Sequence, residues 1–266
     1  MVEPTYLHNQ RAWDERAKGR KRHTKTVEPE HLKDSLPILD PEGWLGGNVR
    51  GQRALCLASG GGLQGPMFAA AGAETVVVDL SSEMLALDKK VAARHALSLE
   101  TRQLSMDDLS ALPAAFFDIV LQPVSTCYVP DVRRVFAEVA RVARPGAVYI
   151  SQHKQPANLQ GDMLPTGEGY LVRERYFRSG PLPPLDMDAM HREADAVEYL
   201  HRWEDILGGL CRAGFTIEDA VEPRQHDLVA ERGTFQHRCC YLPPYIKLKA
   251  RRREETRTSS RLIVPA

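Results

Sequence analysis

The chain has 266 residues, of which 43% are hydrophobic and 26% are charged, as in an ordinary globular protein with its own core. Its 35 Lys and Arg balance 35 Asp and Glu, so no overall field draws it to nucleic acid or to an anionic membrane. The polar N-terminus excludes a signal peptide, no apolar run is long enough to span a bilayer, and the five irregularly spaced cysteines indicate a reducing compartment. We therefore expect a cytoplasmic protein.

The two ends of the chain are polar. Residues 1–40 contain many helix formers, and we predict a helical lid segment there. Residues 41–250 are assigned to one domain, and residues 251–266 to a flexible basic tail. Basic residues gather at 17–25 and 247–253; a solvated face is the expected role of both, and RNA binding is the minor alternative.

Strand and helix patterns alternate from residue 53 onward. Short apolar runs predict strands at 53–59, 75–79, 97–104, 116–121, 147–151 and 215–221. Amphipathic or Ala-rich stretches predict helices at 63–71, 83–95, 131–143 and 199–213, with Asp88 on an exposed face. A further strand-like run at 238–248 is interrupted by Pro243 and Pro244, which favours an edge strand. This alternation predicts an α/β fold with a doubly wound, mostly parallel sheet.

The periodicity fails between residues 152 and 200. Gly, Pro and Met cluster there, in segments such as QPANLQGDMLPTGEGY and SGPLPPLDMDAM. Loops of this length inside a compact domain are usually functional or disordered. We predict that residues 152–200 are an insertion that forms a lid over the substrate.

A glycine-rich loop follows the first of these strands. Gly60, Gly62 and Gly65 have the G-x-G-x-x-G spacing, and Asp79 ends the next strand about 20 residues on. Glycines let the main chain approach a ligand closely, and a carboxylate at that position accepts hydrogen bonds from ribose hydroxyls. The pattern predicts a nucleotide-bearing cofactor, and both a dinucleotide and S-adenosylmethionine fit it.

Three longer stretches favour S-adenosylmethionine over a dinucleotide. LCLASGGG, VVVDLSSEML and FFDIVLQPVSTCYVPDVRRVFAEVARVARPGAVYIS resemble successive motifs of the class I S-adenosylmethionine-dependent methyltransferases of the small-molecule type. The resemblance implies a seven-stranded, Rossmann-like methyltransferase fold and S-adenosyl-L-methionine as cofactor. It also implies in-line methyl transfer to a small-molecule or short-peptide acceptor. The alternatives are an NAD-dependent oxidoreductase, a nucleic-acid-modifying methyltransferase and a binding protein that has lost catalysis.

The resemblance also implies which residues hold the cofactor: Ala58, Ser59, Gly60, Gly61, Gly62, Asp79, Leu80, Met84, Ser105, Met106, Asp107, Gln122 and Pro123. The sequence departs from the family pattern in three places. Cys56 stands where the first motif usually has an acid, and Ala58 where it has a glycine. Ser105 replaces the adenine-contacting acid, so we expect Asp107 to take that role, with a solvated turn as its alternative. Residues 122–125 lack the second proline and the aromatic of base-modifying members, which disfavours a nucleic-acid acceptor.

Methyl transfer depends mainly on holding the acceptor in line with the methyl group, and a base is needed only when the acceptor must first lose a proton. His153, after the fifth strand, is the first candidate for that base and His201 the second; a structural role is the alternative for both. Candidate pocket residues are the aromatics Trp13, Tyr128, Tyr170 and Tyr176. No metal site is expected. The sequence leaves the acceptor atom and the oligomeric state open.

Overall fold

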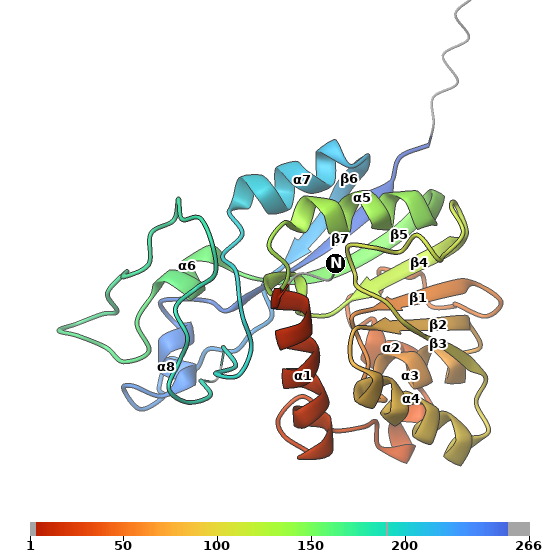
Figure 1. Ribbon diagram of the computed structural model, residues 1–266, viewed down its shortest axis with the longest axis horizontal. Helices are drawn as coiled ribbons and strands as arrows, with labels where there is room; N and C mark the ends of the chain where they lie inside the picture. The colour runs from red at the N-terminus through yellow and green to blue at the C-terminus, as the bar shows by residue number, and fades with distance from the viewer. Residues whose placement is uncertain (1–3, 190, 255–266) are drawn as a thin grey trace, which may run out of the picture.

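The computed structural model describes residues 4–189 and 191–254, which fold around one seven-stranded sheet (Figure 1). The strand order is β3-β2-β1-β4-β5-β7-β6, and β1 to β5 run parallel. The strands are β1 (Arg53–Leu57), β2 (Glu74–Asp79), β3 (Leu99–Gln103), β4 (Phe117–Gln122), β5 (Ala143–Lys154), β6 (Phe215–Val221) and β7 (Tyr245–Arg252). The predicted doubly wound, mostly parallel sheet is confirmed.

Helices cover both faces of this sheet. In Figure 1, α5 (Val132–Val142) and α7 (Gly209–Arg212) lie on one face, and α2 (Leu36–Leu39), α3 (Gln64–Ala70) and α4 (Ser82–His95) lie on the other. The remaining helical elements are α1 (Pro4–Lys18), η1 (Pro29–Leu32), η2 (Thr126–Tyr128), α6 (Pro156–Gln160), η3 (Glu204–Gly208) and α8 (Phe235–Cys239). The helix α4 begins at Ser82, one residue before the predicted start at 83, because the Ser81 hydroxyl caps it by accepting a hydrogen bond from the Met84 amide at 3.1 Å.

Two hydrophobic cores form because successive strand residues point to opposite faces of the sheet. In β1, Leu55 and Leu57 pack on the side of α5, whereas Ala54 and Cys56 pack on the side of α3. All four side chains are fully buried. Burial raises the pKa of the Cys56 thiol, so this cysteine is an inert core residue.

The strand predicted at 238–248 lies elsewhere. Residues Phe235–Cys239 form α8, and β7 starts at Tyr245, just after Pro243 and Pro244. Because the prolines precede the strand, β7 lacks no ladder donor and lies antiparallel between β5 and β6. The edge strand on this side of the sheet is therefore β6, and β3 forms the other edge. Strand β7 includes Arg251 and Arg252, so the predicted tail at 251–266 begins too early; residues 255–266 lie outside the described residues.

The predicted insertion begins after β5, at residue 155, because β5 continues to Lys154. In Figure 1, α6 and α8 lie in one lobe at the end of the sheet beside α1. Helix α1 is bonded to this segment: the buried Arg16 guanidinium lies 2.6 Å from Asp188 and 2.5 Å from Asp195. The Asn9 amide donates to the Val197 carbonyl at 3.0 Å. The N-terminal helix and the end of the insertion are therefore held together by these contacts.

The third glycine of the loop allows α3 to approach the sheet. A Cβ at Gly65 would lie 2.4 Å from Val77 Cγ2 and 3.1 Å from Asp88 Oδ1. We expect Gly65→Ala to lower the free energy of unfolding by roughly 1–3 kcal/mol, the usual cost of overpacking a core. Urea denaturation measures this, with Gly169→Ala, which would meet nothing within 4 Å, as the matched control. Equal midpoints for the two variants would show that the helix does not need this close contact.

Candidate functional site

A cavity of about 630 Å³ opens at the carboxyl ends of the parallel strands. Its size is in the range of small-molecule sites, and its position is where doubly wound sheets bind ligands. One side is formed by the glycine loop and the ends of β2 and β4. The other side comes from α1, from residues 23–28, from the end of β5 and from the insertion.

Bare main chain faces the cavity at Gly60 and Gly61. A Cβ on Gly60 would lie 2.8 Å from Met84 Cβ, and one on Gly61 would lie 3.0 Å from Met84 Cε. Gly61 has a φ of 126°, which side-chain-bearing residues rarely adopt. Ala58, where the family pattern has glycine, has a φ of 49° and tolerates a left-handed conformation that costs roughly 1–2 kcal/mol.

The Asp79 carboxylate lies beside this loop and lines the cavity. Its Oδ2 accepts a hydrogen bond from the Gly60 amide at 2.8 Å, and its Oδ1 accepts one from the Ser81 amide at 2.9 Å. A carboxylate offers about four lone-pair sites, so two backbone bonds leave it able to accept from a ligand. Burial raises the pKa of Asp79 to about 6.

Asp88 supports the loop from below. It was expected on an exposed face of its helix, but the structure buries it, and its Oδ2 accepts a hydrogen bond from the Gly61 amide at 2.9 Å. The expectation is wrong because Asp88 lies one turn after Met84 and shares its inward face. Burial raises the pKa of Asp88 to about 7. The partner amide is 27 residues away, so no local pattern indicated it.

Most of the residues predicted to hold the cofactor line the cavity: Ala58, Ser59, Gly60, Gly61, Asp79, Leu80, Met84, Ser105, Met106 and Pro123. Three others do not. Asp107 is buried behind the wall and accepts a hydrogen bond from the Tyr6 hydroxyl, so its predicted contact with adenine is corrected. Gln122 turns inward to Tyr149 and Ser125. The Gly62 carbonyl is covered by Val27, whose amide donates to it at 2.8 Å.

Comparison with known proteins decides the family. A family model described as a methyltransferase domain matches residues 55–151. The uncharacterized methyltransferase YbaJ of Bacillus subtilis is 32% identical over 230 residues, which make up 82% of this chain and 90% of that protein. The chain belongs to the class I S-adenosylmethionine-dependent methyltransferases. It is an enzyme, with S-adenosylmethionine as its cofactor.

Solved methyltransferases share the fold of this one. An S-adenosylmethionine-dependent methyltransferase from Mesorhizobium loti superposes with a TM-score of 0.63 at 23% identity, over 83% of this chain and 100% of that one. The geranyl diphosphate C-methyltransferase of Streptomyces coelicolor A3(2) gives 0.62 at 15% identity, over 94% and 99%. Among curated relatives, the ubiquinone biosynthesis O-methyltransferase of Alkalilimnicola ehrlichii is 28% identical over 166 residues, 57% of this chain and 63% of that protein.

The cavity of this methyltransferase fits S-adenosylmethionine. Gly60 and Gly61 line the cavity with main chain, and only glycine lets this loop pass so close to Met84, because a Cβ at either position would collide with that side chain. Asp79 offers lone pairs for ribose hydroxyls, and the apolar side chains of Leu80, Met84 and Met106 suit an adenine ring. S-adenosylmethionine carries no phosphate, so its site needs no cation to bind one. Within the described residues no group of three or more His, Cys, Asp or Glu side chains could hold a metal ion.

The two histidines predicted as bases lie outside the cavity lining. His153 is fully buried, with Nδ1 2.9 Å from the Thr126 hydroxyl and Nε2 2.8 Å from the Ser151 hydroxyl. Burial lowers its pKa to about 3, so we correct its role to a structural one. His201 Nε2 bonds the Thr126 carbonyl at 2.9 Å, and burial lowers its pKa as well. Both rings are engaged by protein groups.

The parity of β5 explains the error at His153. Ser151 and His153 share the face that packs on α5, where the His153 ring lies edge-on to Phe136 at 5.9 Å. The alternate residues, Gln152 and Lys154, point into the cavity. Counting the alternation to the end of the strand is the signal that would have selected Lys154.

The predicted pocket aromatics divide into two groups. Trp13 and Tyr128 line the cavity, with their ring centroids 5.6 Å apart and edge-on. Tyr170 instead packs with Tyr241 in the lobe, at 5.6 Å, and the Tyr176 hydroxyl accepts from the Trp203 amide at 3.0 Å. Neither Tyr170 nor Tyr176 lines the cavity: Tyr170 bonds His237 of α8, and the part of the insertion that reaches the cavity is at Glu193.

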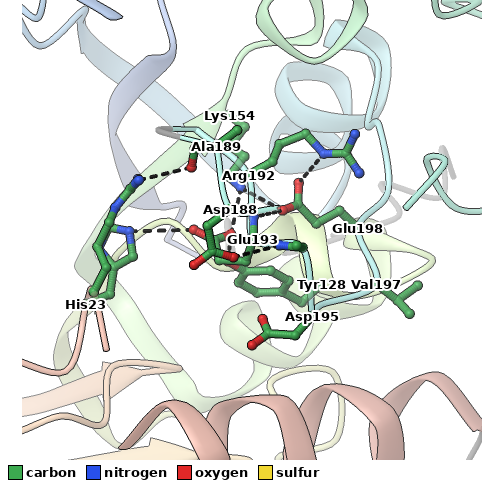
Figure 2. Close-up of polar contacts among 12 residues, drawn as sticks. His23, Tyr128, Lys154, Asp188, Ala189, Arg192, Glu193, Asp195, Val197 and Glu198 are labelled. Atoms are coloured by element: carbon green, nitrogen blue, oxygen red, sulfur yellow. Dashed lines mark hydrogen bonds and ion pairs between the residues drawn. The ribbon is translucent and has the colours of Figure 1, made fainter. Parts of the chain in front are cut away.

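A buried network of charges forms part of the cavity wall, to which Tyr128, Lys154 and Glu193 contribute (Figure 2). Lys154 Nζ lies 3.2 Å from Glu193 Oε2 and 3.1 Å from Glu198 Oε1. The Tyr128 hydroxyl donates to Glu193 Oε2 at 2.7 Å, and Arg192 Nε lies 3.3 Å from Glu198 Oε2. Two cations thus balance two carboxylates, which is how a protein tolerates buried charge.

The pKa values of this network follow from its pairing. Burial alone lowers the pKa of Lys154, but the neighbouring groups, Glu198 and Glu193 among them, raise it overall. Burial alone raises the pKa of Glu193, but Lys154 and the Tyr128 hydroxyl bring it below its usual range. For Glu198, burial dominates and its pKa is raised. Lys154 and Glu193 are therefore a stable ion pair in the cavity wall at neutral pH.

Proposed function

We propose that this methyltransferase acts on a small polar acceptor, which binds between the cofactor loop and the charged wall formed by His23, Lys154 and Glu193. The observation that carries the proposal is the continuity of one cavity from Asp79 and Gly60 to this charged wall. The covers formed by α1 and by the insertion support the lid roles predicted for residues 1–40 and 152–200.

In this mechanism the protein supplies position and shelter. Asp79 would hold the ribose, the Gly60–Gly61 main chain would face the methionine part, and Met84 and Met106 would pack on the adenine. The bound cofactor supplies an electrophilic methyl group on a sulfonium. Trp13 and Tyr128 would orient the acceptor and exclude water, so that the reacting atoms meet in line.

Several observations favour a small acceptor over a macromolecule. The curated and solved relatives named above include enzymes of ubiquinone biosynthesis and of geranyl diphosphate methylation, both with small acceptors. The two basic segments carry paired charges: Lys25 lies 2.9 Å from Glu28, Lys247 lies 2.6 Å from Glu42 and Lys249 lies 3.1 Å from Glu218. Such local compensation does not provide the open cationic surface that nucleic acid requires.

We infer a cytoplasmic location from the cysteines. All five are free, and Cys56, Cys127 and Cys239 are buried. Unpaired buried thiols are typical of a reducing compartment. In the described part of the chain, no helix is both long enough and apolar enough to cross a membrane.

Transfer of labelled methyl groups tests this function directly. The protein would be incubated with cell extract and S-adenosylmethionine labelled in the methyl group, and the extract then separated into small-molecule, protein and RNA fractions. We expect the label in the small-molecule fraction. Label found only in RNA or protein would overturn the proposal, and Asp79→Ala serves as the control for enzyme-dependent transfer.

The pKa of Asp79 makes cofactor affinity depend on pH. The ionised carboxylate accepts hydrogen bonds from ribose, whereas the protonated form loses an acceptor site. Because burial raises its pKa to about 6, we expect affinity for S-adenosylhomocysteine to be constant above about pH 7 and to fall roughly tenfold per unit well below pH 6. Calorimetry across this range measures it. A profile without this inflection, or one unchanged in Asp79→Asn, would contradict the role.

A further inference from the structure

His23 and Glu193 face each other across the acceptor end of the cavity (Figure 2). His23 Nε2 lies 3.5 Å from Glu193 Oε1. The histidine side chain is 45% exposed, whereas the glutamate side chain is 5% exposed. The His23 imidazole is thus accessible from the cavity, and the Glu193 carboxylate lies buried behind it. A catalytic base and the group that orients it are arranged in the same way.

His23 is held close to the cofactor loop. Its carbonyl oxygen lies 3.7 Å from the position of a Cβ on Gly61, and a few residues on, the Val27 amide donates to the Gly62 carbonyl at 2.8 Å. The residue has a φ of 69°, in the left-handed region, where a non-glycine residue is uncommon. Strained positions of this kind persist where the surrounding structure fixes them, and they gather at functional sites.

Glu193 is fixed from behind. Its Oε2 accepts from the Tyr128 hydroxyl at 2.7 Å and from Lys154 Nζ at 3.2 Å. With one oxygen held by two donors, the other oxygen is directed at His23. Glu193 is therefore prepared to accept a hydrogen bond from His23 Nε2, which leaves Nδ1 as the nitrogen that takes a proton.

Partial burial is the main reason that the pKa of His23 is lowered, which favours the neutral imidazole at pH 7. Glu193 opposes this effect and raises the pKa of His23, whereas Arg22, Lys154 and Arg16 lower it further. A neutral imidazole is the form that accepts a proton. Because Glu193 raises the pKa of His23, a measurement of that pKa reports whether the two side chains interact.

Resting on the function proposed above, we propose that His23 is the general base of this methyltransferase, that Glu193 is its positioning residue, and that the acceptor is a hydroxyl compound. A neutral amine can lose its proton after transfer, and a thiol ionises near neutrality without help. A phenol-like hydroxyl, with a pKa near about 10, needs a base as it reacts.

The proposed step is balanced without any further reagent. The acceptor O–H bond breaks and its proton passes to His23 Nδ1, while an oxygen lone pair forms the new C–O bond. The C–S bond breaks with its electron pair remaining on sulfur. The products are a methyl ether, S-adenosylhomocysteine and a protonated His23, whose charge is stabilised by Glu193 until the proton leaves to water.

The first test needs neither cofactor nor acceptor. NMR titration of ring-labelled histidines would give the pKa of His23 in the wild-type protein and in Glu193→Gln. We expect a lower pKa in the variant, because the carboxylate that raises it is gone. Glu168→Gln, which changes an exposed carboxylate of the insertion, is the matched control and should leave the value unchanged. An unchanged pKa in Glu193→Gln would overturn the pairing.

The second test follows the labelled methyl group. We expect the labelled product to carry it on oxygen. His23→Asn should lower the transfer rate by about 10²–10⁴-fold and abolish the rise of rate with pH due to His23, while affinity for S-adenosylhomocysteine changes less than about twofold. His226→Asn, an exposed histidine away from the cavity, should behave as wild type.

The outcomes separate this inference from the proposed function. Label on nitrogen, sulfur or carbon of a small molecule, or a His23→Asn variant that keeps its rate and pH profile, would overturn the inference and leave the proposed function intact. Label only in macromolecules would overturn the proposed function itself.

Discussion

Replacing Lys154 with Met is expected to lower the free energy of unfolding by about 3–5 kcal/mol, because it leaves buried carboxylates without their cation. Lys154 is 5% exposed and lies within 3.2 Å of both Glu193 and Glu198. Arg192 remains beside Glu198 alone, so Glu193 loses its only lysine partner among the described residues. Denaturant unfolding followed by circular dichroism measures the loss.

The effect should depend on pH in a defined direction. Without Lys154, the pKa values of both glutamates rise in the folded state, whereas their unfolded values stay near about 4.3. The folded variant then holds protons that the unfolded chain has lost, so its deficit grows as pH rises from about 4 and shrinks in acid. Lys154→Met combined with Glu193→Gln should recover part of the loss.

An exposed ion pair provides the comparison. Lys25 is 84% exposed and pairs with Glu28 at 2.9 Å, so Lys25→Met should destabilise the fold far less than Lys154→Met. Equal stabilities for Lys154→Met and Lys25→Met would show that the charged wall is solvated, and the geometry of the acceptor site would then need revision.

The second large effect concerns the cofactor. We expect Asp79→Ala to weaken the binding of S-adenosylhomocysteine by at least about 100-fold, because hydrogen bonds to a charged acceptor contribute roughly 1.5–3 kcal/mol each and ribose offers two. The variant also frees the amides of Gly60 and Ser81, which Asp79 holds at 2.8 and 2.9 Å. Calorimetry measures the affinity.

Two further variants isolate this effect from a loss of fold. Asp79→Asn keeps one acceptor oxygen and should bind with intermediate affinity. Asp108→Ala removes an exposed carboxylate outside the cavity lining and should bind as wild type. If Asp79→Ala retains wild-type affinity while its thermal unfolding is normal, Asp79 does not hold the ribose.

The sequence predicts well those features that are determined by residues close together in the chain. The strands β1 and β2 follow from short apolar runs, and α4 follows from the periodic pattern at 83–95. The position of Asp79 beside Gly60 follows because parallel strands end at the same edge of a sheet. These features need no knowledge of distant residues, and the structure has them where they were expected.

The charged wall required tertiary information. Glu193 lies in an irregular insertion with no periodicity, and its partners Lys154 and Tyr128 are 39 and 65 residues away. His23 is one of several polar residues in a basic segment that resembles a solvated face. At the end of β5, choosing Lys154 over His153 required the parity of the strand, because chemical suitability alone selected His153, which does not line the cavity.

A crystal structure with S-adenosylhomocysteine and a phenolic product analogue would test the central claim most directly, because it shows both ends of the cavity at once. We predict the ribose hydroxyls on Asp79, the methionine part against Gly60 and Gly61, and the sulfur directed at the space in front of His23 and Glu193. A nucleoside bound away from Asp79, or a sulfur separated from His23 by protein, would contradict it.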